Sequence, residues 1–220
     1  MARIGLLGGS FNPAHRGHRR ISLFAIRALH LDELWWVVSP GNPLKEDATD
    51  MAPFATRFAS AERMARRSPI RVSDFEQREG IRYTIDTVRS LKRRYPHDRF
   101  IWLLGSDTLT NFHKWRDWRG LAREVPIAVI RRPGYDSSAH AARAMGWLRR
   151  FVRPSSQAMN WTDWSAPAIL SLRLPPDPTS ATRLRAHDPN WHERYPDPTG
   201  GSKRFALPTS VRRALARPFR

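Results

Sequence analysis

Short apolar runs alternate along this chain with segments in which apolar residues recur every three or four positions. The short runs predict strands, and the longer spacing predicts amphipathic helices. Strands are expected at residues 4–7, 34–38, 70–75, 100–104, 126–130 and 168–174, and helices from residue 18 onward and at 51–66, 84–95, 111–123 and 139–151. Strands alternating with helices indicate parallel βα units. We therefore predict an α/β fold with a parallel sheet and helices on both faces.

The pattern weakens toward the C-terminus. Residues 153–167 are polar and irregular, 186–204 are expected to form a loop, and 209–216 a short helix. No internal repeat or linker divides the chain into halves. We predict one domain over residues 1–185, with residues 186–220 forming an irregular C-terminal extension that packs on it.

Composition excludes several classes of protein. The 220 residues include 40% hydrophobic residues and no cysteine, which excludes global disorder, disulfide scaffolds, thiolate metal sites and cysteine nucleophiles. Apolar runs fall short of the about 20 residues that span a bilayer. The N-terminus resembles neither a signal peptide nor a transit leader, so we expect a soluble, cytoplasmic protein. The net charge of +18 comes almost entirely from arginine, a compositional bias that is weak support for nucleic-acid binding.

The candidate chemistry lies between the first strand and the first helix. This segment, residues 8–18, reads GGSFNPAHRGH. In a parallel sheet ligands bind beyond the carboxyl ends of the strands, where a helix N-terminus attracts anions. His15 and His18 are three residues apart, so both would point toward the same phosphates. Taken alone, the glycines fit a tight turn equally well, and the histidines fit helix capping or, less well, a metal site.

The segment resembles the GSFxPxHxGH signature of adenylyltransferases in the nucleotidyltransferase superfamily. Four further segments follow in that family's order: NPLK at 42–45, YTIDT at 83–87, LGSD at 104–107 with three aromatic residues after it, and SATRLR at 180–185. Together they cover about residues 4–185 and resemble bacterial nicotinate-nucleotide adenylyltransferases. The resemblance implies a Rossmann-like sheet and transfer of AMP from ATP to nicotinate mononucleotide, giving deamido-NAD and pyrophosphate in NAD biosynthesis.

The resemblance also implies residue roles. His15 and His18 would be catalytic, stabilising charge on the α-phosphorus and on the leaving pyrophosphate. The implied ATP-binding residues are Gly8, Gly9, Ser10, Phe11, His15, His18, Gly105, Asp107, Ser180, Thr182 and Arg185. The implied substrate-binding residues are Asn42, Lys45, Thr84, Trp115 and Arg132. Mg²⁺ is expected to bind through ATP and water, with no protein metal site.

Within these sets, Asp107 would meet the ribose, Trp115 would stack on the nicotinate ring, and Thr84 would meet the ring carboxylate. Structural alternatives remain open. Ser180, Thr182 and Asp107 fit helix N-caps, and any one tryptophan can be a core residue, as we expect for Trp118. Arg132 is one of many arginines, whereas Lys45 is one of only four lysines.

Some positions depart from the family's pattern. Asn12 stands where many members have Asp, Ala181 where many have Ser, and residues 186–207 match nothing. The nearest rival is an adenylyltransferase for nicotinamide mononucleotide or phosphopantetheine. A rival of another class is an arginine-rich nucleic-acid-binding protein, which would need a basic stripe with interleaved aromatics, whereas the basic residues here are scattered. We expect ATP and nicotinate mononucleotide as partners, no membrane and no specific nucleic acid; the sequence leaves a homo-oligomer open.

Overall fold

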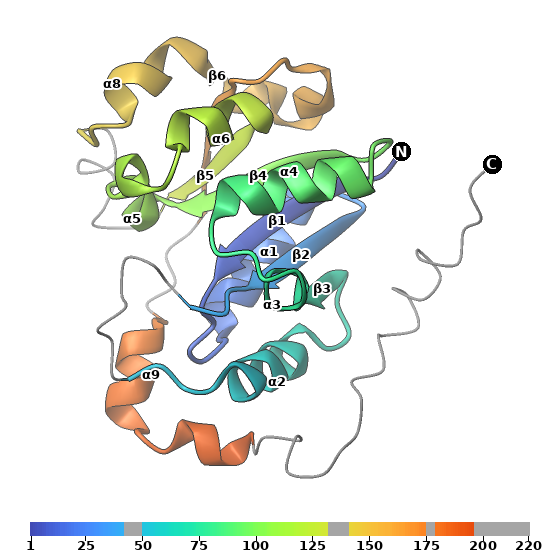
Figure 1. The fold of residues 1–220 in the computed structure, drawn as a ribbon. Coiled ribbons are helices and arrows are strands. Elements are labelled where there is room, and N and C mark those ends of the chain that lie inside the picture. Colours follow the sequence, from blue (N-terminus) through green and yellow to red (C-terminus); the bar gives the residue numbers. More distant parts are fainter. Residues whose placement is uncertain (42–49, 132–140, 175–178, 196–220) are drawn as a thin grey trace, which may run out of the picture.

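The computed structural model describes residues 1–41, 50–131, 141–174 and 179–195 (Figure 1). These residues form one seven-stranded sheet, in which every pair of neighbouring strands is parallel, in the order β3-β2-β1-β4-β5-β7-β6. The strands are β1 (Arg3–Gly9), β2 (Glu33–Val38), β3 (Ile70–Ser73), β4 (Arg99–Gly105), β5 (Ile127–Arg131), β6 (Val152–Arg153) and β7 (Ile169–Arg173). The predicted α/β parallel sheet is confirmed.

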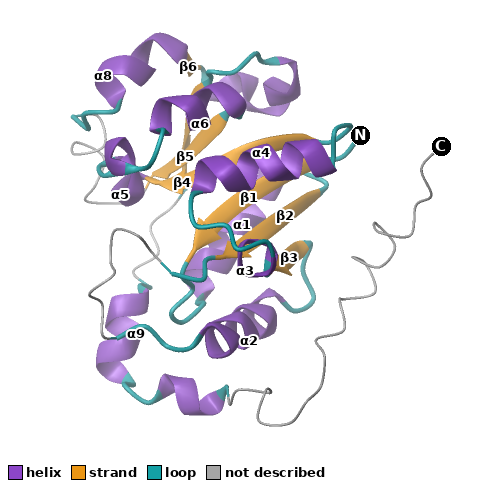
Figure 2. Cartoon of the chain, viewed as in Figure 1, coloured by secondary structure: helices purple, strands orange, loops and turns teal. Residues whose placement is uncertain are grey.

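Helices cover both faces of the sheet (Figure 2). The α-helices are α1 (Arg16–Ala28), α2 (Phe54–Ala65), α3 (Phe75–Arg78), α4 (Thr84–Arg94), α5 (Ser106–Leu109), α6 (Trp118–Glu124), α8 (Met145–Leu148) and α9 (Ala181–His187). The described residues also form four 3-10 helices: η1 (Phe112–Lys114), η2 (Arg149–Phe151), η3 (Ser155–Asp163) and η4 (Trp191–Arg194). One face carries α3, α4, α6 and α8, and the other carries α1, α2 and η3.

The alternation of side chains along the strands divides the core into two layers. In β4, Phe100, Trp102 and Leu104 pack toward α4 and α6, whereas Ile101 and Leu103 pack toward α1 and α2. All five side chains are buried, as expected for a central parallel strand with helices on both faces. The continuous apolar run of β4 therefore follows from its position in the middle of the sheet.

The sheet reverses its strand order between β1 and β4. The chain runs outward from β1 through β2 to β3, then returns to the other side of β1 as β4. The two adjacent strands are in register from Arg3 opposite Arg99 to Leu7 opposite Leu103, so their carboxyl ends lie side by side. Such a switch point leaves a crevice for a ligand in open α/β sheets. It is here that the turn at residues 8–18 begins.

The structure differs from the sequence prediction in several places. Phe75, expected to end a strand, begins α3, and its buried side chain explains the extra apolar position. The predicted helix at 111–123 is broken into η1 and α6 by Asp117, which has a positive φ of 44° and caps α6 through Gly120 N (3.1 Å). The predicted helix at 139–151 is reduced, within its described part, to the short helices α8 and η2.

The segment expected to be irregular contains η3, anchored by Trp161. Its buried indole Nε1 donates to the carbonyl of Leu29 at 2.9 Å. Part of the predicted C-terminal loop forms η4, where Trp191 is buried and the Arg63 guanidinium lies 5.9 Å from the Tyr195 ring. The expected helix at 209–216 lies outside the described residues, and the division at residue 185 stays a prediction. No helix in the described part of the chain has the length and apolar character needed to cross a membrane.

Candidate active site

The two motif histidines form one unit at the start of α1. His15 is the N-cap residue, and its Nδ1 accepts a hydrogen bond from Gly17 N at 3.1 Å. His18 Nδ1 accepts from His15 N at 3.2 Å, so the two side chains form a reciprocal capping box. Their ring centroids are 3.8 Å apart. Because each Nδ1 accepts a hydrogen bond, the proton of each neutral imidazole is carried by Nε2. The pair therefore presents two N–H donors at the N-terminus of a helix, where anions bind.

Aromatic packing holds this pair in place. Phe11 is buried, stacks on Trp36 at 4.9 Å and lies 4.9 Å from the His18 ring. Trp36 Nε1 in turn donates to the Ser22 hydroxyl at 2.7 Å, one turn further along α1. Phe11 has a positive φ of 49°, so the turn enters a conformation that side chains rarely adopt. A packed layer therefore fixes the orientation of the imidazoles.

Gly17 allows the SATRLR segment, residues 180–185, to approach the histidine pair. A Cβ at Gly17 would lie 3.0 Å from the His15 ring and 3.3 Å from the carbonyl oxygen of Thr179. The next residue, Ser180, is the N-cap of α9 and accepts from Arg183 N at 3.2 Å. The helix-capping alternative for Ser180 is therefore observed. The structure brings the start of SATRLR next to the first turn of α1, although the two segments are far apart in the sequence.

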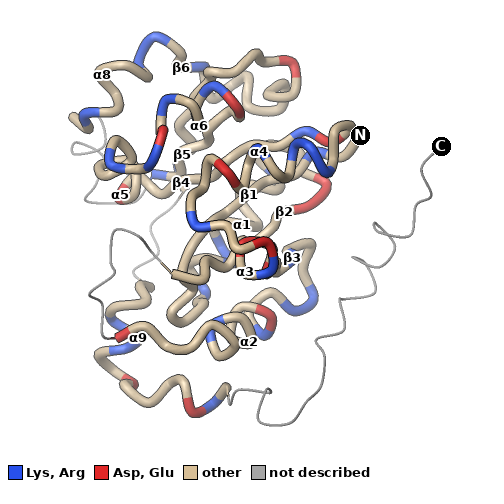
Figure 3. Tube along the Cα trace, in the orientation of Figure 1, with Lys and Arg blue, Asp and Glu red and all other residues tan. Residues whose placement is uncertain are grey.

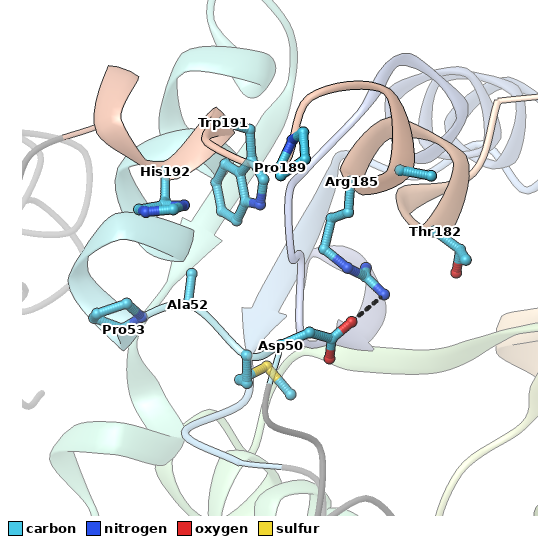
Figure 4. Close-up of a pocket in the computed structure, with 10 residues that line it drawn as sticks. Asp50, Ala52, Pro53, Thr182, Arg185, Pro189, Trp191 and His192 are labelled. Carbon is cyan, nitrogen blue, oxygen red and sulfur yellow. Dashed lines mark ion pairs between the residues drawn. The ribbon is translucent and has the colours of Figure 1, made fainter.

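Arg185 lies on α9 and connects three parts of the chain. Its Nη1 donates to the Asn12 carbonyl at 2.8 Å, and its Nη2 lies 2.7 Å from Asp50 Oδ2. Figure 4 shows the Arg185 side chain extending from α9 toward Asp50. The Asn12 side chain also bonds the backbone of Asp50 and Ala52, at 2.8 and 3.1 Å. Asn12 thus serves as a backbone clamp at the position where many family members have Asp.

A pocket lies between α9 and the loop that precedes α2. Its volume is about 520 Å³, and Arg185 and Asp50 line it together with Trp191 and His192 (Figure 4). Of the predicted site residues that the structure describes, only Thr182 and Arg185 line this pocket. It therefore neighbours the histidine pair without containing it.

Gly8 has a packing role that the sequence did not reveal. A Cβ at Gly8 would lie 2.7 Å from Cζ2 of Trp102, which is buried on the neighbouring strand. The Trp102 ring in turn meets Trp115 edge to face, with centroids 6.4 Å apart. Gly9 is less crowded, because a Cβ at that position would lie 3.4 Å from the Phe11 ring. The glycine at position 8 thus makes room for an indole beside the predicted nicotinate platform.

Replacement of Gly8 by Ala is expected to destabilise the fold by about 2 kcal/mol, because the added methyl group overpacks the core against a rigid ring. The effect should shrink in a Trp102→Leu background, which removes that ring. Gly146→Ala is the matched control, since nothing lies within 4 Å of its Cβ position. Urea denaturation of Gly8→Ala, Trp102→Leu, the double variant and Gly146→Ala, each compared with wild type, measures these changes in the free energy of unfolding. An unchanged stability together with a raised KM for ATP would instead assign Gly8 to close phosphate approach.

The carboxyl end of β4 contributes Gly105 and Asp107. Gly105 is the N-cap of the four-residue helix α5, and Asp107 is in its first turn. The N-cap alternative for Asp107 is therefore wrong, because Gly105 occupies that position. Trp115 follows η1 and is half-buried, packing against Phe112 at 5.4 Å. Trp118 packs on the same core cluster, in agreement with its expected structural role.

Thr84 is the first residue of α4, which covers the face of the sheet opposite to α2. Behind this helix start lies Glu76, a buried carboxyl that the sequence analysis missed. Burial raises the pKa of Glu76 to about 7, against the opposing effect of the Thr87 hydroxyl, which donates to Oε1 at 2.7 Å. Asn42, Lys45 and Arg132 lie outside the described residues.

Arg57 is a second site-bordering residue that the sequence analysis missed. It is on α2 at the same helical spacing as the buried Phe58, Ala61 and Ala65, and it is itself 1% exposed. A charged residue within an apolar stripe is the signal that could have identified it. Lys and Arg otherwise occur over many elements, with Asp and Glu between them (Figure 3). Within the described ranges, no group of three His, Asp or Glu side chains could hold a metal ion.

Comparison with known proteins matches the chain to one family over most of its length. The family model described as cytidylyltransferase-like matches residues 6–187. A probable nicotinate-nucleotide adenylyltransferase of Erythrobacter litoralis is 55% identical over 193 residues, covering 88% of each chain. Another from Gluconobacter oxydans is 50% identical over 183 residues, covering 83% of this chain and 93% of the relative.

A solved structure supports the same fold at much lower identity. Plasmodium falciparum nicotinic acid mononucleotide adenylyltransferase complexed with NaAD aligns with a TM-score of 0.63 at 18% identity, covering 90% of this chain and 92% of that chain. The Rossmann-like fold and the resemblance drawn from five ordered motifs are confirmed. The chain belongs to the nicotinate-nucleotide adenylyltransferase family, nucleotide-binding nucleotidyltransferases of NAD biosynthesis.

Proposed function

We propose that the chain binds ATP and nicotinate mononucleotide at the switch point and transfers AMP between them. A phosphate oxygen of nicotinate mononucleotide attacks the α-phosphorus of ATP. The new P–O bond forms as the bond to the β-phosphate oxygen breaks, so deamido-NAD and pyrophosphate result. The attacking group is already a phosphate, and no enzymic nucleophile is needed. Catalysis then comes from positioning and charge stabilisation.

The paired Nε2–H donors of His15 and His18 carry this proposal. Both Nδ1 atoms are occupied by backbone hydrogen bonds, so both donors are fixed at the N-terminus of α1. Negative charge increases on the α-phosphoryl oxygens and the leaving pyrophosphate as the reaction proceeds. Preoriented donors stabilise such charge more than the ground state. The two histidines therefore have the properties that this transition state requires.

The remaining predicted residues are assigned around the histidine pair. The backbone of Gly9, Ser10 and Phe11 and the α9 residues Ser180 and Thr182 border the ATP phosphates. Arg185 reaches the same region, where a phosphate would compete with Asp50 for its guanidinium. Gly8 supports the site through Trp102, and Gly105 and Asp107 face the nucleotide ribose. Asn42, Lys45 and Arg132 are proposed for the substrate from the sequence alone.

Mg²⁺ is proposed as a cation that arrives with ATP. Mg²⁺ usually keeps several waters and binds through substrate phosphates rather than through a cage of protein ligands. When bound, the cation neutralises phosphate charge. A cytoplasmic location is also part of this proposal.

The direction of group transfer can be tested with isotopic label. With ATP labelled at the α-phosphate, the account requires the label in deamido-NAD and none in pyrophosphate. Label that stays in ATP or appears in free AMP without the dinucleotide would contradict the proposal.

Trp115→Ala is expected to raise the KM for nicotinate mononucleotide about fivefold while changing the KM for ATP little, because ring stacking contributes about 1 kcal/mol. Trp118→Ala is the matched control, since it removes the same side chain three residues later, where it contacts Phe112 and Trp147. Steady-state kinetics with each substrate varied would measure this. Equal effects on both KM values would argue against a stacking role.

The nucleic-acid alternative finds only local support. Around α6 and α8, Arg119 lies 4.9 Å from the Trp118 ring, and Arg123 lies 5.3 Å from the Trp147 ring. These guanidinium groups stack on the protein's own rings, which reduces the ring surface that could stack on bases. We therefore propose no second function.

A further inference from the structure

Arg57 is enclosed where three loops meet at the carboxyl ends of the strands. Its Nε donates to the Ala52 carbonyl at 2.9 Å, and its Nη1 donates to the carbonyls of Ser10 (2.7 Å) and Ser39 (2.8 Å). Its Nη2 donates to the Pro40 carbonyl at 3.0 Å. One guanidinium thus joins the turn after β1, the end of β2 and the loop before α2.

The turn after β1 is also held by other contacts from the same side. Ala14 N donates to the Ser60 hydroxyl of α2 at 3.2 Å, and the Asn12 side chain is clamped by the backbone of Asp50 and Ala52. Helix α2 and its preceding loop therefore fix the turn at three successive points. Arg57 supplies the first of these, at Ser10. Ser10 directly precedes Phe11, the residue that packs against the His18 ring.

The bonding partners of Arg57 are unusual for a buried cation. All four of its acceptors are backbone carbonyls, and among the described residues no carboxylate pairs with it. Burial lowers the pKa of Arg57 to about 10, so the side chain remains charged at neutral pH. Besides these carbonyls, its guanidinium lies 5.5 Å from the centre of the Phe54 ring. A buried charge without a carboxylate partner is unfavourable for stability compared with an apolar side chain. This arrangement suits a site that accepts polyanions, because the positive potential lies directly behind the turn.

We propose that Arg57 is a positioning residue for AMP transfer, which holds the Ser10 backbone and hence the turn in the shape that receives the ATP phosphates. This inference rests on the proposed function, because ATP is the proposed ligand of that turn. Arg57 does not contact substrate in this account. It acts through the backbone of the turn and through its charge.

The test compares Arg57→Met and Arg57→Lys with the wild-type protein. Arg57→Met removes the charge and all four hydrogen bonds, and we expect kcat/KM for ATP to fall about 30-fold, since small misplacements of phosphate ligands are costly to the rate. The KM for nicotinate mononucleotide should change less than about twofold, because the hydrogen bonds of Arg57 go to Ser10, Ser39, Pro40 and Ala52, which lie outside α4 and α5. Arg57→Lys retains the charge with three donors and should show an intermediate loss.

Phe58→Leu is the control for loss of stability. Phe58 is the next residue on α2, is buried and stacks on Phe54 at 5.9 Å, so its truncation weakens the helix packing without removing the bonds to the turn. We expect Phe58→Leu to lower Tm and leave kinetics near the wild-type values. If Arg57→Met lowers only Tm, as this control does, the positioning role is wrong. If Arg57→Met does not fold, the test rests on Arg57→Lys. A loss of kcat/KM for ATP without a matching change in the KM for nicotinate mononucleotide then supports the positioning role, and wild-type kinetics of Arg57→Lys overturn it.

Calorimetric titration with a non-hydrolysable ATP analogue separates this inference from the proposed reaction. We expect weaker binding of the analogue to Arg57→Met and Arg57→Lys than to wild type. If the wild-type protein forms no deamido-NAD, the proposed function fails, whereas this titration still reports on the turn. Equal analogue affinity in wild type and both Arg57 variants would overturn the positioning role.

Discussion

His18→Ala is expected to lower kcat for deamido-NAD formation by about 10²-fold or more, with the fold preserved. The substitution removes one of two preoriented donors, and loss of a comparable donor in other enzymes has an effect of this size. It also removes the acceptor for His15 N, which caps α1, so a stability loss of about 1 kcal/mol should accompany it. Steady-state kinetics and thermal unfolding of the same preparations measure the two effects separately.

Two further variants distinguish the capping role of His18 from its catalytic role. His18→Asn can keep an acceptor for His15 N but has no group at the Nε2 position, so we expect restored stability without restored kcat. His18→Gln places an amide donor near Nε2 and should recover part of kcat. His97→Ala, at an exposed histidine after α4, is the matched control. Near-normal kcat in folded His18→Asn would contradict a donor role for His18.

Glu76→Gln is expected to stabilise the protein by about 3 kcal/mol at pH 8 and to have little effect near pH 4. Burial raises the pKa of Glu76 from 4.5 to about 7 in the folded state. Between these values the folded chain keeps a proton that the unfolded chain releases, so the wild-type free energy of unfolding falls as pH rises from about 4.5 to 7. Gln retains a partner for the Thr87 hydroxyl and carries no charge, which removes this loss.

The pH dependence is measured by denaturant unfolding of both proteins from pH 4 to 8. Glu79→Gln is the control, because Glu79 is exposed and pairs with Arg94 at 3.3 Å. The difference between wild type and Glu76→Gln should grow with pH, whereas the Glu79→Gln difference should not follow this curve. A Glu76→Gln difference that is constant across the range would contradict a raised pKa at Glu76.

Most of the fold could be predicted because the central strands β2, β4 and β5 are short apolar runs that are largely buried between helices on both faces. The edge strand β6 was not predicted, because it consists of two exposed residues. The misses have local causes. Phe75 lies two residues after the end of β3 and is included in the predicted strand, although it begins α3 and packs in the core cluster of α4 and α6, whereas Ile70 of β3 packs in the cluster on the other face. Asp117 breaks the expected helix by adopting a left-handed conformation, and its side chain caps α6 at Gly120, where a Cβ would clash with the Asp117 carboxylate. Trp161 anchors η3 in a segment whose polar neighbours predict loop.

The candidate site could be predicted where a residue's role depends on sequence spacing. His15 and His18 lie together because both belong to one helix start, and the spacing of three determines that. The contacts of Gly8 and Arg57 depend on neighbouring strands and loops, which sequence spacing does not specify. From the sequence, Gly8 therefore fits a tight turn or phosphate binding, whereas the structure shows that Trp102 leaves no room for a side chain at this position. Arg57 appeared in the sequence as one basic residue among many, although its guanidinium binds the Ser10 carbonyl.

The central claim is that this chain joins AMP to nicotinate mononucleotide at the switch point of its sheet. The most direct test measures pyrophosphate release with ATP and Mg²⁺ while nicotinate mononucleotide, nicotinamide mononucleotide and phosphopantetheine are offered in parallel. The account predicts the highest kcat/KM with nicotinate mononucleotide, with deamido-NAD as the product. A higher kcat/KM with either other acceptor, or no release with any of the three, would contradict it.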